Sequence, residues 1–296
     1  MVKMIKFKEK RKTIRKSTKD IVVFYHNDCT DGFSSAWAAW KKLGDKADYI
    51  GISPGTAPAV WLKNKEVYTV DLIFPIQYLK KLIATNKKLV AIDHHASNQE
   101  AFELIPEGSF DLKHSGAVLS WQYFHPKTKV PKLLEHVEDM DLWKFKIPNS
   151  KEIIAYLDTI DFDFKNWDEM AKGVEKKFKR EKYLEKGRFI LKYQDQLVEN
   201  IISNHSVLVN FFGYKSYAVN SPIFNSQIAN TLYKKLPPIG IVWVQGNEGD
   251  VHVSLRSDGS VDVSKLAGKF AGGGGHKQSS GFTVENFSKL PWKKIK

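Results

Sequence analysis

Three apolar runs in the first half of the chain each end in acidic or histidine side chains. These side chains are His26, Asp28 and Asp31 after the first run, Asp71 after the second, and Asp93, His94 and His95 after the third. A buried charge must be paired or bind a metal ion, because removing it from water is costly. Carboxylates mixed with imidazoles suit borderline divalent ions such as Mn²⁺. The three segments therefore predict a metal site.

A fourth segment, EHVEDMDLWKF, adds Asp139 and Asp141 after a short helix. Several carboxylates together can bridge two ions, and a two-metal site polarises a phosphoryl oxygen and supplies a hydroxide nucleophile. A single Asp or His at a strand end is more often a helix cap than a ligand. Four separate segments with acids or imidazoles at one edge are much harder to explain in that way.

The elements that must position these side chains follow a regular alternation. From Ile21 to about Pro148, β-rich runs alternate with helical stretches, which is typical of βαβ units and a parallel sheet. In such sheets ligands bind at the carboxyl ends of the strands. We therefore expect an α/β fold in which the strand-end side chains converge on one edge.

The second half of the chain predicts a helical linker and a smaller α+β domain. Residues 161–204 are charged and almost free of Pro and Gly, which favours one or two connecting helices. A hairpin, a helix capped by Ser226 and further strands are expected after them. The expected domains are a metal-binding domain at 20–160, a linker at 161–204 and a substrate-binding domain at 205–290.

A glycine-rich stretch near the C-terminus offers a site for an anion. The sequence AGGGGHKQSSGF places four glycines directly before His276, and glycine backbone N–H groups can turn toward a phosphate. Arg256 could add a bidentate contact to a phosphate. A glycine run is also common in flexible loops, and an arginine at a strand end is common on surfaces, so both interpretations stay open here.

The bulk composition narrows the class of protein. The 296 residues carry a formal net charge of +13, which favours polyanionic partners, with nucleic acid first. The one cysteine, Cys29, excludes an internal disulfide and fits a reducing cytoplasm. No run is long and apolar enough for a membrane span, so no membrane partner is expected. Residues 1–20 are interpreted as a basic N-terminal segment that is either solvated or binds nucleic acid.

Five stretches taken together resemble the DHH phosphoesterase superfamily, in the branch with a C-terminal DHHA1 domain. They occur in this order across nearly the whole chain: HNDCTDGFSSAW, the run ending in Asp71, DHH, EDMDLWKF and GGGGHKQSSGF. The superfamily includes RecJ-type exonucleases, nanoRNases, cyclic-dinucleotide phosphodiesterases, exopolyphosphatases and family II pyrophosphatases. The resemblance implies Mn²⁺-dependent hydrolysis of a phosphodiester or phosphoanhydride in a cleft between two domains, with two Mn²⁺ ions and Mg²⁺ or Co²⁺ as substitutes.

The resemblance also implies a role for each matching residue. The implied metal ligands are His26 for the first ion, Asp31, His94 and Asp139 for the second, and Asp71 bridging both. The residues implied to bind substrate are His95, Arg256, Gly274, Gly275 and His276. Asp71, His94 and His95 would form the catalytic centre, with a metal-bridging hydroxide as the nucleophile.

The first stretch departs from the pattern of many relatives. It is one residue shorter, and Cys29 stands where the first of two acids would align. Three interpretations are open: Cys29 ligates the first ion as a thiolate, Asp28 ligates it in place of Cys29, or the first ion is held more loosely. A similar choice exists between Asp139 and Asp141, and alignment through LWKF favours Asp139, with Asp141 orienting a ligand.

The function that the sequence favours is hydrolysis of short oligonucleotides or nucleotide-like diesters by a cytoplasmic, nanoRNase-like enzyme. Polyphosphate or pyrophosphate is the alternative substrate class. A non-catalytic nucleic-acid-binding scaffold is the alternative of a different kind, because some DHH-like proteins have lost ligands. Metal-dependent turnover that Asp71→Ala abolishes separates the enzyme from the scaffold. The oligomeric state, RNA against DNA and the direction of cleavage stay open.

Overall fold

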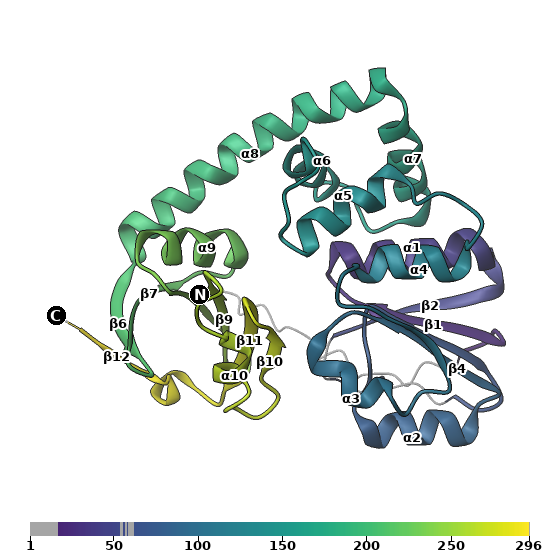
Figure 1. The fold of residues 1–296 in the computed structure, drawn as a ribbon, viewed down its shortest axis with the longest axis horizontal. Helices are drawn as coiled ribbons and strands as arrows, with labels where there is room; N and C mark the ends of the chain where they lie inside the picture. Colours follow the sequence, from purple (N-terminus) through teal and green to yellow (C-terminus); the bar gives the residue numbers. More distant parts are fainter. Residues whose placement is uncertain (1–16, 54–55, 57, 59–61, 296) are drawn as a thin grey trace, which may run out of the picture. The chain divides into compact units, whose positions relative to one another are not determined.

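The computed structural model describes residues 17–53, 56, 58 and 62–295 (Figure 1). Most of the predicted basic N-terminal segment, residues 1–16, lies outside the described residues. The chain forms two compact units. The first contains the described residues up to His94, together with Asn98–Pro148 and Ile160–Glu175, and the second contains the rest.

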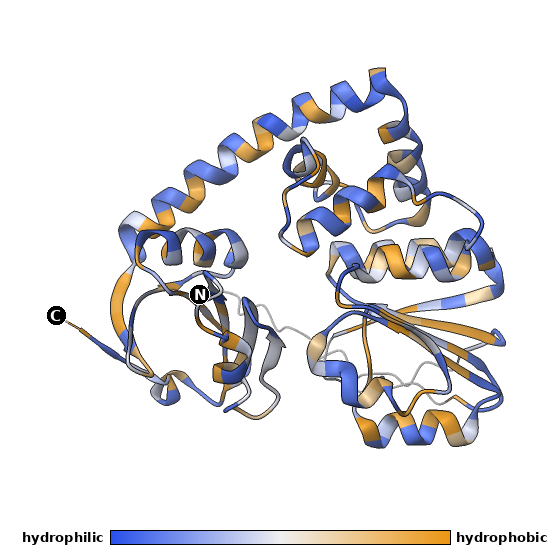
Figure 2. Cartoon of the chain, in the orientation of Figure 1, coloured by the Kyte–Doolittle hydropathy of each residue, from blue (hydrophilic) through white to orange (hydrophobic). Residues whose placement is uncertain are grey.

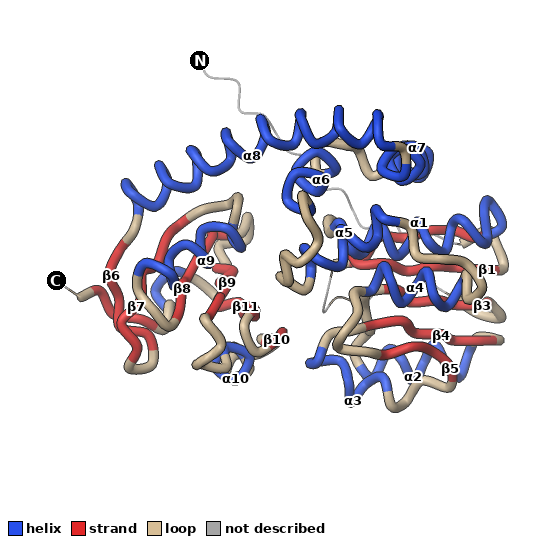
Figure 3. The backbone as a smooth tube through the Cα atoms, turned by 45° about the horizontal axis from the view of Figure 1, so that its top comes forward, coloured by secondary structure: helices blue, strands red, loops and turns tan. Residues whose placement is uncertain are grey.

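The first unit is built on a five-stranded parallel sheet, as the alternation of β-rich and helical runs predicts. Its order is β2-β1-β3-β4-β5, and Figure 3 shows β1, β3, β4 and β5 as a stack of strands. The strands are β1 (Ile21–His26), β2 (Ala47–Ile52), β3 (Glu66–Val70), β4 (Lys88–Asp93) and β5 (Glu107–Phe110). The order reverses at the β1/β3 junction, where open α/β sheets bind their ligands.

Helices cover both faces of this sheet, because alternate strand residues point to opposite sides. Val22, Phe24 and Val67 pack with α2, whereas Val23 and Val90 pack with the face that holds α1 and α4. The helices are α1 (Thr30–Leu43), α2 (Ile76–Thr85), α3 (Gln99–Phe102), α4 (Gly116–Phe124), α5 (Lys132–Asp141) and α7 (Phe164–Glu175), with short 3₁₀ turns at Gly44–Lys46 and Ala96–Asn98. Figure 2 shows hydrophobic segments alternating with hydrophilic ones along these helices.

Two helices occupy the segment for which the sequence predicts a linker. The first, α7, packs against α1 and α5 in the first unit, where the Trp167 indole N–H donates to Ser34 Oγ at 3.0 Å. The second, α8 (Lys177–His205), is 29 residues long and packs against α6 (Ser150–Leu157). Gly187 allows this contact, since a Cβ there would lie 2.0 Å from the Glu152 carbonyl oxygen.

The second unit contains a seven-stranded mixed sheet in the order β10-β11-β9-β8-β7-β6-β12. Among the strands of the described residues in this unit, β7 and β8 pair in parallel and the other neighbours pair antiparallel. Its strands are β6 (Val207–Phe211), β7 (Tyr214–Asn220), β8 (Ile239–Gln245), β9 (Val251–Ser257), β10 (Gly274–His276), β11 (Ser279–Val284) and β12 (Trp292–Lys294). Its other helices are α9 (Asn225–Lys235), α10 (Val263–Ala267) and a 3₁₀ turn at Phe287–Lys289. The predicted fold class, a parallel-sheet domain followed by an α+β domain, is confirmed.

The predicted cap of α9 is wrong. The helix begins at Asn225, and its N-cap is Phe224, two residues before the predicted cap. Phe224 makes no side-chain cap hydrogen bond. The Ser226 hydroxyl instead accepts a hydrogen bond from Arg256 at 2.6 Å. Among the helices of the described residues, none combines the length and the apolarity that crossing a membrane needs.

Candidate metal centre

The order of the sheet places three predicted ligand segments side by side. Strand β1 ends at His26, β3 ends one residue before Asp71, and β4 ends one residue before His94. These strands are direct neighbours in the sheet. Because all three run parallel, their carboxyl ends share one edge. The predicted convergence of the three strand ends is therefore present in the first unit.

Asp71 lies between two histidines. Its Oδ2 is 3.3 Å from His26 Nδ1, and its Oδ1 is 3.3 Å from His94 Nε2. The residue is 1 % exposed and has a φ of 57°, a conformation that turns the chain directly after β3. Its backbone N–H still donates to the Ile92 carbonyl of β4 at 2.8 Å, which fixes the residue to the sheet. Each carboxylate oxygen thus faces a different imidazole.

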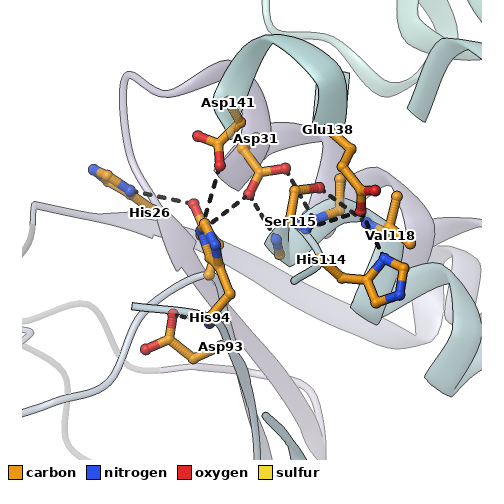
Figure 4. Close-up of polar contacts among 12 residues, drawn as sticks. His26, Asp31, Asp93, His94, His114, Ser115, Val118, Glu138 and Asp141 are labelled. Carbon is orange, nitrogen blue, oxygen red and sulfur yellow. Dashed lines mark hydrogen bonds and ion pairs between the residues drawn. The ribbon is translucent and has the colours of Figure 1, made fainter. Parts of the chain in front are cut away.

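Asp31 and Asp141 complete one side of the group (Figure 4). The distance from His94 Nε2 is 3.7 Å to Asp31 Oδ2 and 3.6 Å to Asp141 Oδ2. Asp31 comes from the first turn of α1, and Asp141 is the last residue of α5. Ligand atoms of Asp31, His94 and Asp141 all lie within 4.8 Å of one another, a spacing that one metal ion can span.

Cys29 rather than Asp28 belongs to the other side of the group. Ligand atoms of His26, Cys29 and Asp71 lie within 4.8 Å of one another. Cys29 is the N-cap residue of α1, so its position is fixed by the start of that helix. Asp28 is exposed, has a φ of 52° and accepts a hydrogen bond from the Asn27 side chain at 2.8 Å. Of the alternatives for the shortened stretch, the structure therefore favours Cys29.

The first unit buries these acids close to one another. Burial, followed by the nearby Asp71 and Asp141 carboxylates, raises the pKa of Asp31 well above its usual value. Burial and the same carboxylates, with Asp31, also raise the pKa of the Cys29 thiol. Both effects disfavour the charged forms in the absence of a cation. A divalent cation would offset both.

The predicted ligand Asp139 does not join this group. Its carboxylate accepts hydrogen bonds from the backbone N–H groups of Lys146 at 2.7 Å and Ile147 at 3.1 Å. Asp139 is 2 % exposed and its oxygens hold the loop that follows α5. Residues two apart on a helix point about 200° apart, so Asp139 and Asp141 cannot face the same group. The ligand proposed at this position is therefore Asp141, in place of Asp139.

The N-terminus of α4 holds Asp31, a contact that the sequence did not predict. The backbone N–H groups of Gly116 and Ala117 donate to the Asp31 carboxylate at 2.8 and 3.0 Å. Gly116 is needed for close approach, because a Cβ there would lie 2.7 Å from Asp71 Oδ1. The signal available in the sequence is Ser115, a cap residue before an apolar run, which accepts from the Val118 N–H at 3.3 Å.

Glu138 fixes this helix start from the other side (Figure 4). Its Oε2 accepts from the Ser115 backbone N–H at 3.0 Å and lies 2.9 Å from His114 Nδ1. Lys144 Nζ lies 3.5 Å from Glu138 Oε1 and donates to the Lys113 carbonyl at 2.9 Å. Residues next to Asp139 and Asp141 in sequence therefore position α4, which in turn positions Asp31.

Asp93 and His95 flank His94 in the chain but lie differently. Asp93 is fully buried; it accepts from its neighbour's backbone N–H at 2.8 Å and from Asn98 Nδ2 at 2.6 Å. These bonds hold the turn that presents His94. His95 is partly exposed and is grouped with the second unit. Its predicted role at the substrate stays a prediction.

The predicted substrate residues of the second unit form one row of its sheet. Strand pairing sets His276 opposite Ser279, and Ser279 opposite Arg256. Side chains directly opposite in an antiparallel pair point to the same face, so Arg256 and His276 share one face. The Arg256 guanidinium also donates to the Leu255 carbonyl at 2.9 Å. Its bond to Ser226 fixes it beside the first turn of α9.

The glycines before His276 differ in what they require. Gly275 has a φ of 131°, and a Cβ there would lie 2.6 Å from the Ser279 carbonyl oxygen. A side chain is therefore excluded at Gly275 by both conformation and space. Gly274 is the first residue of β10 and pairs with Gly281 of β11. Of the two interpretations that the sequence left open for the glycine run, the flexible loop does not hold at Gly274 and Gly275, which belong to a short strand. The anion site stays a prediction.

The donor set in the first unit fits divalent metal ions. It combines three carboxylates, two imidazoles and one thiol. Asp31, Asp71 and His94 are almost fully buried, whereas His26, Cys29 and Asp141 are more exposed. Buried carboxylates this close are stabilised when they coordinate a cation. Asp71 faces both histidines, so it is placed to join two ions.

Comparisons with known proteins agree with this division. Residues 204–294 match the DHHA1 domain family. The chain is 30% identical to the uncharacterised protein R106 of Acanthamoeba polyphaga mimivirus over 303 residues, which covers 93% of this chain and 70% of that protein.

Solved structures with a similar arrangement include an uncharacterised protein from Helicobacter pylori G27. It is 18% identical, has a TM-score of 0.42, and the match covers 91% of this chain and 94% of that one. An exopolyphosphatase-related protein from Bacteroides fragilis is 14% identical, has a TM-score of 0.48, and the match covers 90% and 87% of the two chains.

Proposed function

Because this chain belongs to the DHH phosphoesterase superfamily, in the branch with a C-terminal DHHA1 domain, and to the family of the mimivirus protein R106, we propose that it hydrolyses phosphodiester bonds of short oligonucleotides or nucleotide-like diesters with Mn²⁺. DHH phosphoesterases are metal-dependent hydrolases. The choice of Mn²⁺ as the metal and of short oligonucleotides or nucleotide-like diesters as the substrate is our proposal.

The observation that carries the proposal is the position of Asp71. One oxygen lies 3.3 Å from His26 and the other 3.3 Å from His94. We assign His26, Cys29 and Asp71 to one ion, and Asp31, Asp71, His94 and Asp141 to the other. Held by these residues, two ions would lower the pKa of a water molecule, which could then act as nucleophile, and would offset negative charge on the phosphoryl group.

The surrounding residues supply orientation. The α4 N–H groups hold the Asp31 carboxylate so that it faces His94, and Asp93 holds the turn that presents His94. Ligands that are fixed in this way lose little entropy when they bind a metal or substrate. His95, the next residue, is proposed to contact a phosphate oxygen of the substrate.

The second unit is proposed to hold a phosphate. Arg256 presents a guanidinium that is fixed by Ser226, and His276 lies on the same face of the sheet. Guanidinium and imidazole N–H groups recognise phosphate oxygens. The ordered glycine strand leaves its backbone close to the same row. These contacts would recognise the charge of a phosphate group and not the identity of a base.

Polyphosphate or pyrophosphate is the second candidate substrate class. The observation in its favour is that the proposed phosphate-binding groups, the Arg256 guanidinium and the His276 imidazole, would bind the oxygens of an inorganic polyphosphate as well as those of a phosphodiester. The net charge of +13 attracts either polyanion. A scaffold without catalysis is the remaining alternative, and it predicts binding of nucleic acid that does not depend on divalent metal.

A panel of substrates tests the proposal. Wild type, Asp71→Asn and Asp28→Asn are each given Mn²⁺ and a labelled dinucleotide, a longer single strand, a cyclic dinucleotide or polyphosphate. We expect wild type to cleave the dinucleotide and Asp71→Asn to lose at least about a thousandfold in turnover, whereas Asp28→Asn, an exposed acid of the same loop, keeps it.

The outcomes separate the alternatives. Cleavage of polyphosphate alone moves the assignment to the second substrate class. Absence of turnover on all four substrates, with nucleic acid still bound in EDTA, supports the scaffold and overturns the enzyme. Equal turnover by wild type and Asp71→Asn overturns the assigned metal centre.

A further inference from the structure

The helix α8 carries three large side chains that are exposed to solvent. Phe178 is 73% exposed, Phe189 is 69% exposed and Tyr193 is 63% exposed. These three are among the most exposed large hydrophobic residues of the described chain. Figure 2 shows hydrophobic bands between hydrophilic ones along this helix.

The three rings lie on one face of α8. At about 100° per residue, Phe189 and Tyr193 fall roughly 20° and 60° from Phe178 around the helix axis. The buried residues of the helix, Leu184, Gly187, Val198 and Ile202, fall on the opposite side. The face with the rings is therefore not the face that packs on the rest of the second unit.

The same face is net positive, although it also carries Glu181 and Glu185, about 60° and 20° from Phe178 around the axis. Residues 176–193 contain eight Lys and Arg and only two Glu. Lys182 Nζ lies 4.5 Å from the centre of the Phe178 ring, and Lys182, Arg188 and Lys192 fall within about 80° of Phe178 around the axis. The Lys186 ammonium lies instead over the Tyr156 ring of α6. The segment thus alternates aromatic rings with ammonium groups.

We propose that this face of α8, defined by Phe178, Lys182, Phe189, Lys192 and Tyr193, binds single-stranded nucleic acid. Rings on which bases stack, set among cations that contact phosphates, are the two components of sequence-tolerant binding of single strands. Phe189 and Tyr193 are separated by about 6 Å along the helix axis, so neighbouring bases can reach both.

A second copy of this chain fits the same face less well. Two identical faces would bring their lysines together, and like charges disfavour that contact. Three rings in sixteen residues also fall short of the repeating apolar positions that a coiled coil needs. A single strand supplies both the opposite charge and the flat surfaces. This proposal does not rest on the catalytic assignment, since it concerns other residues.

Binding without divalent metal tests the proposal. The full chain is titrated in EDTA against a labelled 20-nucleotide single strand, and the fluorescence anisotropy is followed. We expect Phe189→Ala to weaken binding about tenfold and the change to be larger with Tyr193→Ala added. Phe287→Ala, which removes a ring that is 59% exposed outside α8, is the matched control and should bind as wild type does.

Salt dependence provides a second readout. Lys182→Gln combined with Lys192→Gln should reduce the magnitude of the slope of log K against log salt by about 1.4, because two phosphate contacts to a single strand are lost. Unchanged affinity in the ring variants, or an equal loss in Phe287→Ala, overturns the proposal. So does a change of oligomeric state in the ring variants by light scattering, because it assigns the face to a second copy. Turnover of a dinucleotide is tested separately.

Discussion

Replacing Gly116 by alanine is the sharpest test of how the metal centre is positioned. A Cβ at this position would lie 2.7 Å from both the Cβ and Oδ1 of Asp71, whereas ordinary contacts begin at 3.4 Å. The two residues must therefore move apart by about 0.7 Å, the difference between these distances. The backbone N–H of Gly116 also holds Asp31, so the shift changes the spacing of two proposed ligands.

The expected effect on stability and the expected effect on activity differ in size. Overpacking costs about 1–3 kcal/mol, and replacing a helical glycine by alanine returns about 0.5–1 kcal/mol, so Tm should fall only modestly. A displacement approaching 1 Å at catalytic groups can cost roughly a hundredfold in rate. We therefore expect turnover to fall by tens of fold and Mn²⁺ affinity to weaken, while the protein stays folded.

Calorimetric titration with Mn²⁺, turnover of the preferred substrate and a thermal melt are compared for Gly116→Ala and a matched control. Gly268→Ala is that control, because its Cβ would meet only the Ser264 carbonyl oxygen, at 3.2 Å. Wild-type Mn²⁺ affinity and wild-type turnover in Gly116→Ala would refute the reasoning, since they would mean that the contact with Asp71 does not position the ligands.

Further predictions concern neighbouring residues. Asp141→Asn should weaken Mn²⁺ binding with little change in Tm, whereas Asp139→Asn should lower stability by about 1–3 kcal/mol, because a partly buried backbone N–H group loses its carboxylate acceptor. Titration and melting of both variants check the contrast. With Co²⁺, we expect a thiolate-to-metal absorption band that Cys29→Ser removes. Because the pKa values of Asp31 and Cys29 are raised, metal binding should release protons and tighten as pH rises, which titrations at several pH values measure. Ser226→Ala should raise KM more than it lowers kcat, because the Arg256 guanidinium loses the hydrogen bond to Ser226 that fixes its position.

Much of the first unit could be predicted from the sequence because its chemistry follows from strand order. Parallel strands end on one edge, so His26, Asp71 and His94 had to converge once the βαβ alternation was recognised. The α+β character of the second unit also followed from local patterns. These features depend on periodicity and turn residues, which a single sequence contains.

The remaining features depend on contacts between distant segments. The choice between Asp139 and Asp141 depends on which side of α5 faces α1 and α4, and both are acids at the end of the same helix. Likewise, Ser226 has the residue type of a helix cap, but its hydroxyl accepts a hydrogen bond from Arg256 of β9. The close approach of Gly116 to Asp71 links residues 45 positions apart. No local pattern contains these distances.

The stoichiometry of Mn²⁺ binding tests the central claim most directly. Wild type and Asp71→Asn are equilibrated with Mn²⁺, and bound metal is measured per chain together with the electron paramagnetic resonance spectrum. The assigned centre predicts two ions per wild-type chain that are magnetically coupled, and loss of the coupling together with at least one ion in Asp71→Asn. A single uncoupled ion in wild type, or an unchanged spectrum in Asp71→Asn, would contradict a two-metal site bridged by Asp71.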